Sequence, residues 1–117
     1  MLSFHAHLKV FVASAPCDLR MNFNGLWAAA TERLGEDPKS GALFVFGNRR
    51  RNRIKILYFD GTGDCILAKR LEEGTFHWPQ SAGEPNAKLR LSPAALQLLL
   101  DGVGLKAAGR RAWYEAA

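Results

Sequence analysis

Cysteine is scarce in this chain, which has only Cys17 and Cys65 among 117 residues. Two cysteines so far apart are too few for a disulfide framework, and they lack the close spacing of a zinc knuckle or a redox pair. Long apolar runs are also missing, since none approaches the roughly 20 residues needed to cross a bilayer. The first residues carry no basic segment before their apolar stretch, so we do not expect a secretory signal peptide. These absences favour a cytoplasmic protein that has no membrane partner.

The composition is that of an ordinary globular domain. Hydrophobic residues make up 48% of the chain and charged residues 23%. A chain of this length buries roughly two-thirds of its unfolded surface, which is enough for a core without cross-links. We therefore expect a single domain over residues 1–117, with its core at about 8–105 and a peripheral tail at 106–117.

Positive charge is concentrated in one segment. The formal net charge is +5. Residues 1–40 carry four basic and four acidic side chains, and residues 72–117 carry five of each. Residues 41–71 carry seven basic side chains but only two acidic ones, Asp60 and Asp64. A local excess of this kind favours a polyanionic partner.

Apolar spacing predicts a first helix over residues 18–34. Asp18 is placed to cap its start, because a carboxylate there accepts free backbone N–H groups, and Gly35 is placed to end it. The interior Gly25 costs the helix about 1 kcal/mol relative to alanine, so we expect it to admit another backbone. One apolar stripe follows the helical period: Phe23, Leu26, Trp27, Ala30 and Leu34.

Alternating residues and turn signals predict an antiparallel sheet. Asp60-Gly61 lies between two apolar runs, which is a strong hairpin signal. Short connections join three of the runs into an antiparallel meander, and Pro79 closes a further short run. The expected strands are 8–13, 42–47, 53–59, 64–71, 75–78 and 88–91.

Ser92-Pro93 predicts the start of a second helix over 92–102, with serine as the cap and proline at the first helical position. Gly102 and Gly104 are placed to end it, and the residues expected to face inward are Leu96, Leu99, Leu100 and Val103. The predicted fold class is α+β, with two main helices packed on one face of the antiparallel sheet.

Candidate catalytic and metal-binding residues have ordinary structural alternatives. Asp18 and Arg20 resemble a catalytic pair, but a helix cap with an ion pair to a nearby strand explains them better. Asp60 and Asp64 flank a glycine-rich turn, where aspartate is favoured because it bonds its own backbone. Two-metal chemistry needs carboxylates that converge from several rigid elements, and the chain offers no convincing third partner. We therefore expect no catalytic residues, no metal and no cofactor.

Histidine and cysteine give no clear site either. His5 and His7 supply at best half of a zinc site, and His77 sits between two aromatic residues. Neither Cys17 nor Cys65 has an obvious base partner for nucleophilic chemistry.

The ordered motifs resemble one family over roughly residues 8–105. They are Asp18-Leu19-Arg20, Phe23 with Gly25-Leu26, the run Arg49–Leu57, Asp60-Gly61, Lys69-Arg70-Leu71-Glu72 with Gly74, and Phe76 with Trp78-Pro79. In this order and spacing the chain resembles the TnpB-type, Orf2-like accessory proteins of insertion sequences of the IS66 family. Met21 and Asn24 depart from the pattern, which has a lysine and an aspartate at these positions.

The resemblance implies a non-enzymatic accessory factor for transposition, encoded beside a separate transposase that holds the catalytic acidic residues. Two molecular roles remain open: DNA contact, or docking on the transposase with little or no DNA binding. An enzyme of nucleic-acid metabolism is a third alternative. We expect DNA contact at transposon ends, through Arg49, Arg50, Arg51, Arg53 and Lys55, with Arg20, Lys69 and Arg70 as an extension. The residues expected to be structural are Asp18, Gly25, Asp60, Gly61, Trp78 and Pro79.

Overall fold

Six strands and two main helices make up the computed structural model, which describes residues 7–80, 88–102 and 114–116. The strands are β1 (Val10–Ala13), β2 (Leu43–Gly47), β3 (Arg53–Phe59), β4 (Asp64–Arg70), β5 (Lys88–Leu91) and β6 (Tyr114–Ala116). The helical segments are α1 (Phe23–Ala28), the π-helical η1 (Ala29–Arg33), the 3₁₀ turn η2 (Pro38–Ser40) and α2 (Pro93–Leu100). No helix within these described ranges is long and apolar enough to cross a bilayer.

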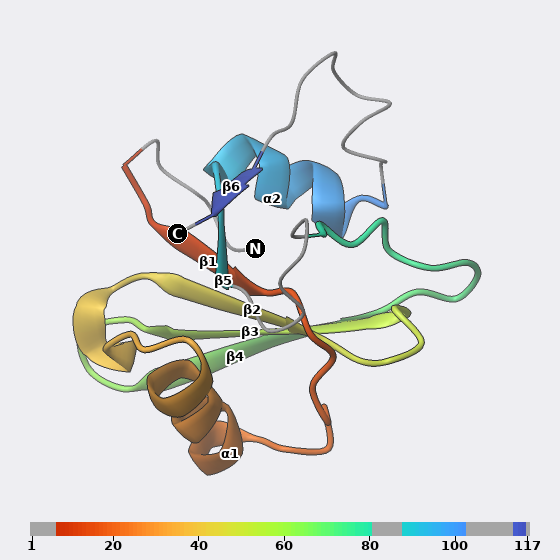
Figure 1. Cartoon of the computed structure of the whole chain (residues 1–117). Helices are drawn as coiled ribbons and strands as arrows, with labels where there is room; N and C mark the ends of the chain where they lie inside the picture. The colour runs from red at the N-terminus through yellow and green to blue at the C-terminus, as the bar shows by residue number, and fades with distance from the viewer. Residues whose placement is uncertain (1–6, 81–87, 103–113, 117) are drawn as a thin grey trace.

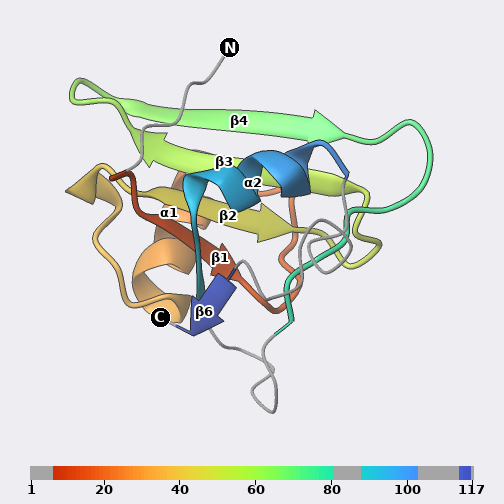
Figure 2. The same ribbon diagram turned by 90° about the horizontal axis from the view of Figure 1, so that it is seen from above.

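All six strands form one sheet in the order β4-β3-β2-β1-β5-β6 (Figure 2). The antiparallel meander expected from the short turns is confirmed in β2, β3 and β4. One pair differs from the expectation, because β1 lies parallel to β2. The chain between them forms α1 and η1, which is the crossover that parallel neighbours require. The sheet is therefore mostly, but not wholly, antiparallel.

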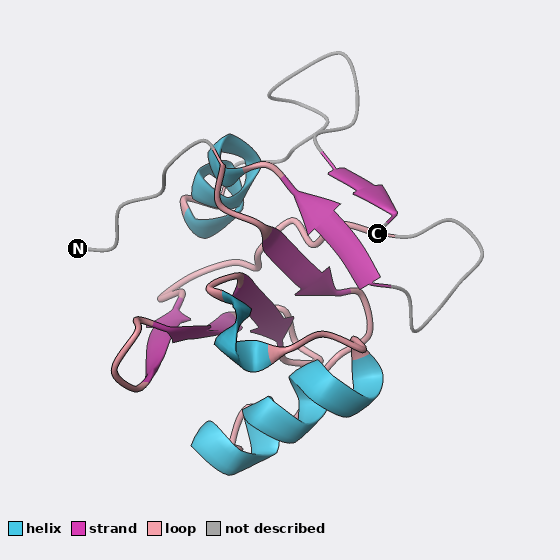
Figure 3. Ribbon diagram, turned by 90° about the vertical axis from the view of Figure 1, so that its left-hand side faces the viewer, coloured by secondary structure: helices cyan, strands magenta, loops and turns pink. Residues whose placement is uncertain are grey.

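The helices lie on opposite faces of the sheet, so the expectation that both pack on one face is wrong (Figures 1 and 3). Val10 and Val12 of β1 pack with Leu96 in a cluster on the α2 face. Phe11 of β1 packs with Leu26 in a second cluster on the α1 face. Every residue of β1 and β2 is buried, since strands that are apolar on both sides require cover on both faces.

The first helix begins at Phe23, not at residue 18. Asn22 occupies the N-cap position, but its side chain makes no capping hydrogen bond to the helix, and Asp18 bonds its own turn instead. Only part of the apolar stripe is buried, because Phe23 is 48% exposed while Leu26 lies in the core. A Cβ on Gly25 would meet the Met21 side chain at 2.7 Å, so this glycine admits a side chain and not another backbone.

The second helix begins as expected. The Ser92 hydroxyl accepts a hydrogen bond from the Ala95 N–H at 3.0 Å, and Pro93 is the first helical residue. Gly102 follows the helix with a φ of +79°. Val103, Gly104 and residues 106–113 lie outside the described residues.

One expectation about an irregular segment is wrong. No strand forms at 75–78, where Phe76 and Trp78 are buried in an extended connection. Within the tail, β6 pairs antiparallel with β5 at the edge of the sheet.

Candidate nucleic-acid interface

Four exposed arginines gather at one end of the sheet. Arg49 and Arg50 lie in the turn between β2 and β3, where β3 begins with Arg53. Arg53 is directly opposite Arg70, the last residue of β4. Among the described residues, no ion pair or side-chain hydrogen bond involves any of these four guanidinium groups. This end of the sheet therefore presents positive charge that no carboxylate of the described residues offsets by direct contact.

Asn48 shapes the turn that carries Arg49 and Arg50. Its Oδ1 accepts hydrogen bonds from the backbone N–H groups of Asn52 at 3.1 Å and Arg53 at 3.0 Å. Its Nδ2 donates to the Asn52 Oδ1 at 2.7 Å. Neither asparagine was predicted to have this role, although asparagine beside a predicted turn is the signal for such side-chain-to-backbone bonding.

Arg51 points into the structure, unlike its neighbours. Its Nη2 donates to the Ser14 carbonyl at 2.8 Å, and its guanidinium carbon lies 4.6 Å from the centre of the Trp78 ring. Its Nη1 is buried with no hydrogen-bond partner, and burial lowers the pKa of the guanidinium. The backbone adopts a φ of +57°, a left-handed conformation that is uncommon for a residue with a side chain. Arg51 therefore fastens the turn to the segment after β1.

Trp78 completes this contact as a core residue. Its Nε1 donates to the Ala13 carbonyl at 3.0 Å, and Pro79 beside it is also buried. Gly47, the last residue of β2, lies directly under the ring, because a Cβ there would be 2.6 Å from a ring carbon. Gly47 was not predicted to be structural, since its only signal in the sequence is a glycine at the end of an apolar strand.

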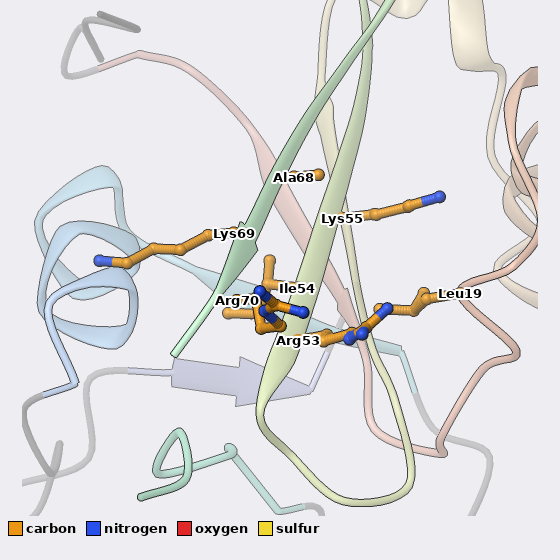
Figure 4. Close-up of a pocket in the computed structure, with 7 residues that line it drawn as sticks. All are labelled: Leu19, Arg53, Ile54, Lys55, Ala68, Lys69 and Arg70. Carbon is orange, nitrogen blue, oxygen red and sulfur yellow. The ribbon is translucent and has the colours of Figure 1, made fainter. Parts of the chain in front are cut away.

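The ammonium groups of Lys55 and Lys69 donate hydrogen bonds to residues at the ends of the two helices. Lys55 donates to the Met21 carbonyl at 2.9 Å and to the Asn22 Oδ1 at 2.8 Å, just before α1. Lys69 donates to the Leu100 carbonyl at 2.6 Å, at the end of α2, where a cation also complements the helix dipole. The two lysines extend to opposite sides of the sheet (Figure 4). Both lie beside the four exposed arginines, but their charged ends are engaged within the fold.

A pocket of about 300 Å³ opens between the ends of β3 and β4 (Figure 4). Arg53 and Arg70 lie at its centre, while Leu19 forms one side. Its lining residues are Leu19, Arg53, Ile54, Lys55, Ala68, Lys69 and Arg70. Among these described lining residues, four are cationic and none is acidic.

Asp18 and Arg20 form an exposed pair within one turn, so Asp18 is neither a helix cap nor the partner of a strand. The Arg20 Nη2 donates to the Asp18 Oδ2 at 2.8 Å, and the Arg20 backbone N–H donates to Oδ1 at 3.0 Å. The side-chain bonds from Arg20 are the main reason that the pKa of Asp18 falls to about 2. This pairing offsets the charge of Arg20, which sets it apart from the four free arginines.

Asp60 closes the hairpin at the opposite end of β3. Its Oδ1 accepts hydrogen bonds from the backbone N–H groups of Thr62 at 2.9 Å and Gly63 at 3.0 Å, and Gly61 adopts a φ of +102°. The Thr62 N–H contributes most to the fall in the pKa of Asp60, to about 2. Asp64 begins β4 and is exposed. No three His, Cys, Asp or Glu side chains in the described part of the chain are grouped to hold a metal ion.

Comparison with known proteins identifies the family. The sequence model for the IS66 Orf2-like protein matches residues 8–110, which is most of the chain. The chain belongs to this family. Two proteins of Sinorhizobium fredii (strain NBRC 101917 / NGR234) are similar to this chain. Uncharacterized protein y4hO is 36% identical over 88% of this chain and 87% of its own length. Uncharacterized protein y4jC is 36% identical over 82% of this chain and 80% of its own length. No solved structure matches.

In this IS66 Orf2-like protein, the two positions expected to depart from the family pattern lie at and just before the start of α1. Met21 stands where a lysine is expected; its side chain covers Gly25 and its carbonyl accepts the bond from Lys55. Asn24 is exposed on α1. The family places the protein with insertion sequences, as the resemblance implied.

Both cysteines of the IS66 Orf2-like protein are free thiols with raised pKa values. Cys17 is buried, which raises the pKa of its thiol although Arg33 lies 3.2 Å from the sulfur. Desolvation likewise raises the pKa of Cys65, with Asp60 adding to the effect. His7 and His77 are exposed, and His5 lies outside the described residues.

Proposed function

We propose that this protein is a non-enzymatic accessory factor for transposition that contacts DNA through Arg49, Arg50, Arg53 and Arg70. The observation that carries the proposal is the gathering of four unpaired, exposed guanidinium groups at one end of a rigid sheet. Such groups bind phosphates and release the counterions condensed on DNA. Phosphate contacts position a protein without reading sequence, so we expect little intrinsic sequence preference, including at the element's ends.

The arrangement of carboxylates supports a role without catalysis. Asp18 and Asp60 each accept hydrogen bonds from residues two or three positions away in their own turn. Through these bonds each carboxylate stabilises its own turn, and the two turns lie at separate places in the fold. Metal-dependent cleavage or joining of DNA instead needs carboxylates that converge on shared ions. We therefore assign the chemical steps to the separate transposase.

The test is fluorescence anisotropy with a short duplex over a series of salt concentrations. If four phosphates are neutralised, log K falls with log salt at a slope of roughly −3.6. The double variant Arg49→Gln/Arg50→Gln removes two of the contacts, so we expect its slope to be less steep by roughly 1.8. Lys39→Gln is the matched control: this exposed lysine lies in η2, at the other end of β2 from the arginine turn.

Two results would contradict DNA contact by these arginines. The wild-type protein would show no binding at low salt, or the double variant would keep the wild-type slope and affinity. In either case the basic end of the sheet is only a solvated surface. Cleavage of the duplex in magnesium or manganese by the purified protein would instead contradict the non-enzymatic role.

A second candidate function, docking on the transposase, is favoured by Phe23. It is the exposed large hydrophobic side chain among the described residues, and it projects from the first turn of α1 beside the partly buried Trp27. A pull-down with the transposase of the same element, with and without its terminal DNA, tests this role. Docking through α1 predicts that Phe23→Ser no longer captures the transposase in the absence of DNA. The control Lys39→Gln should still capture it.

A further inference from the structure

Arg53 and Arg70 form a cross-strand pair of like charges. They are direct partners in the antiparallel register of β3 and β4. Directly opposite like charges destabilise a sheet. The neighbouring cross-strand pair, Lys55 and Ala68, adds a third cationic residue to the same face without a carboxylate. An anion bound between the two guanidinium groups would therefore offset this repulsion.

The pocket described above has the dimensions and chemistry for such an anion. Its volume of about 300 Å³ exceeds the roughly 30 Å³ that one water molecule occupies in the liquid by about tenfold. The ammonium groups of Lys55 and Lys69 donate to oxygens of the protein itself. The free donors of the lining are therefore the guanidinium groups of Arg53 and Arg70.

We infer that Arg53 and Arg70 bind a single phosphate group between them. Each guanidinium presents a planar fork of N–H donors that matches two phosphate oxygens. A phosphate shared by both neutralises the repulsion across the strands. This inference rests on the proposed function in so far as the phosphate belongs to DNA. The group recognised is the same for an internal phosphodiester of the backbone and for a terminal phosphate at a DNA end.

The first test uses inorganic phosphate and needs no DNA. Thermal unfolding is measured in phosphate and in chloride at matched ionic strength and pH. At about ten times its dissociation constant, phosphate raises the melting temperature of the wild type by roughly 5 °C. Arg53→Gln and Arg70→Gln lose this increase, and each melts at or above the wild-type temperature in chloride because the repulsion is gone. Arg49→Gln, in the adjacent turn, keeps the increase.

The inference is overturned if phosphate stabilises the wild type no more than chloride does. It is also overturned if Arg49→Gln loses as much of the increase as Arg70→Gln, because the effect then comes from general surface charge.

The second test separates the two sources of phosphate, using duplexes with and without a 5′-terminal phosphate. Recognition of a terminal phosphate predicts that Arg53→Gln and Arg70→Gln abolish a preference for the phosphorylated duplex. Recognition of an internal phosphate predicts equal losses, about tenfold, on both duplexes. DNA binding that is unchanged in both variants, with no phosphate-dependent stabilisation, refutes the phosphate site and leaves DNA contact to Arg49 and Arg50 alone. Phosphate-dependent stabilisation without any DNA binding refutes the proposed function alone.

Discussion

Arg49 and Arg51 are two positions apart in one turn, yet their guanidinium groups have opposite environments. Arg49 is exposed, whereas Arg51 stacks on Trp78 and donates to the Ser14 carbonyl. A run of arginines in sequence therefore separates into residues available to a partner and a residue that holds the turn. The same division separates Arg53 from Lys55, whose ammonium group is bonded to the residues before α1.

Replacement of Arg51 is expected to reduce stability and not DNA affinity. Arg51→Gln loses a charge-assisted hydrogen bond and a cation–π contact, which lowers the free energy of unfolding by about 1–2 kcal/mol. Arg49→Gln is the matched control and changes it by less than about 0.5 kcal/mol. Urea denaturation gives both values. Unchanged stability combined with weaker DNA binding would show that Arg51 contacts DNA instead.

Asp18 and Asp60 make stability dependent on acid pH. Hydrogen bonds, chiefly from the Arg20 side chain to Asp18 and from the Thr62 N–H to Asp60, lower both carboxyl pKa values from 3.8 to about 2. A carboxyl with a lower pKa in the folded state stabilises the fold above its unfolded pKa, and this contribution disappears as pH falls through the folded pKa. We therefore expect stability to decrease between about pH 4 and pH 2.

Carboxyl NMR titration and urea denaturation across this range measure the effect. The double variant Asp18→Asn/Asp60→Asn is expected to lose part of the acid dependence. Carboxyl midpoints near the ordinary value of 3.8 would contradict the assignment.

At the scale of elements, the packing of Trp78 on the end of β2 requires a residue without a side chain at Gly47. The Trp78 ring covers Gly47 so closely that a Cβ would lie 2.6 Å from it. Because the ring is also fixed by its bond to Ala13 and by Arg51, it has little freedom to move aside.

Gly47→Ala is therefore expected to destabilise the protein by about 1–3 kcal/mol through overpacking. Gly63→Ala is the control, because a Cβ at Gly63 meets no atom within 4 Å. Chemical denaturation with tryptophan fluorescence follows both variants. Equal stability of the two would mean that Trp78 is free to shift.

At the scale of the whole molecule, one sheet separates two apolar clusters. Leu26 belongs to the cluster under α1, and Ile56 belongs to the cluster under α2. Both side chains are fully buried. The α1 face also carries Arg53 and Arg70, so packing on that face supports the basic end of the sheet.

Substitutions on the two faces are expected to be independent. Leu26→Ala costs about 2–5 kcal/mol and Ile56→Val about 0.5–1.5 kcal/mol, since each leaves a cavity in its own cluster. The free-energy changes should add in the double variant to within about 0.5 kcal/mol. Coupling above about 1 kcal/mol, measured by urea denaturation, would show that the sheet transmits strain between its faces.

The sequence by itself determined the features that depend on neighbours along the chain. The meander, the Asp60-Gly61 turn and the Ser92-Pro93 helix start were predictable because hairpin turns and caps are local hydrogen-bonding patterns. The family was also visible, since it rests on ordered motifs.

Only the tertiary structure decided what depends on long-range packing. Residues distant in sequence determine the parallel pairing of β1 with β2, the opposite faces of the two helices and the burial of Arg51. Aspartate is a residue type that often caps helices, but the carboxylate of Asp18 bonds Arg20 instead of a helix N-terminus. The helix begins only at Phe23. The division of the basic residues into free and engaged groups follows from where Trp78, Asn22 and Leu100 lie in space, and residue spacing does not encode those positions.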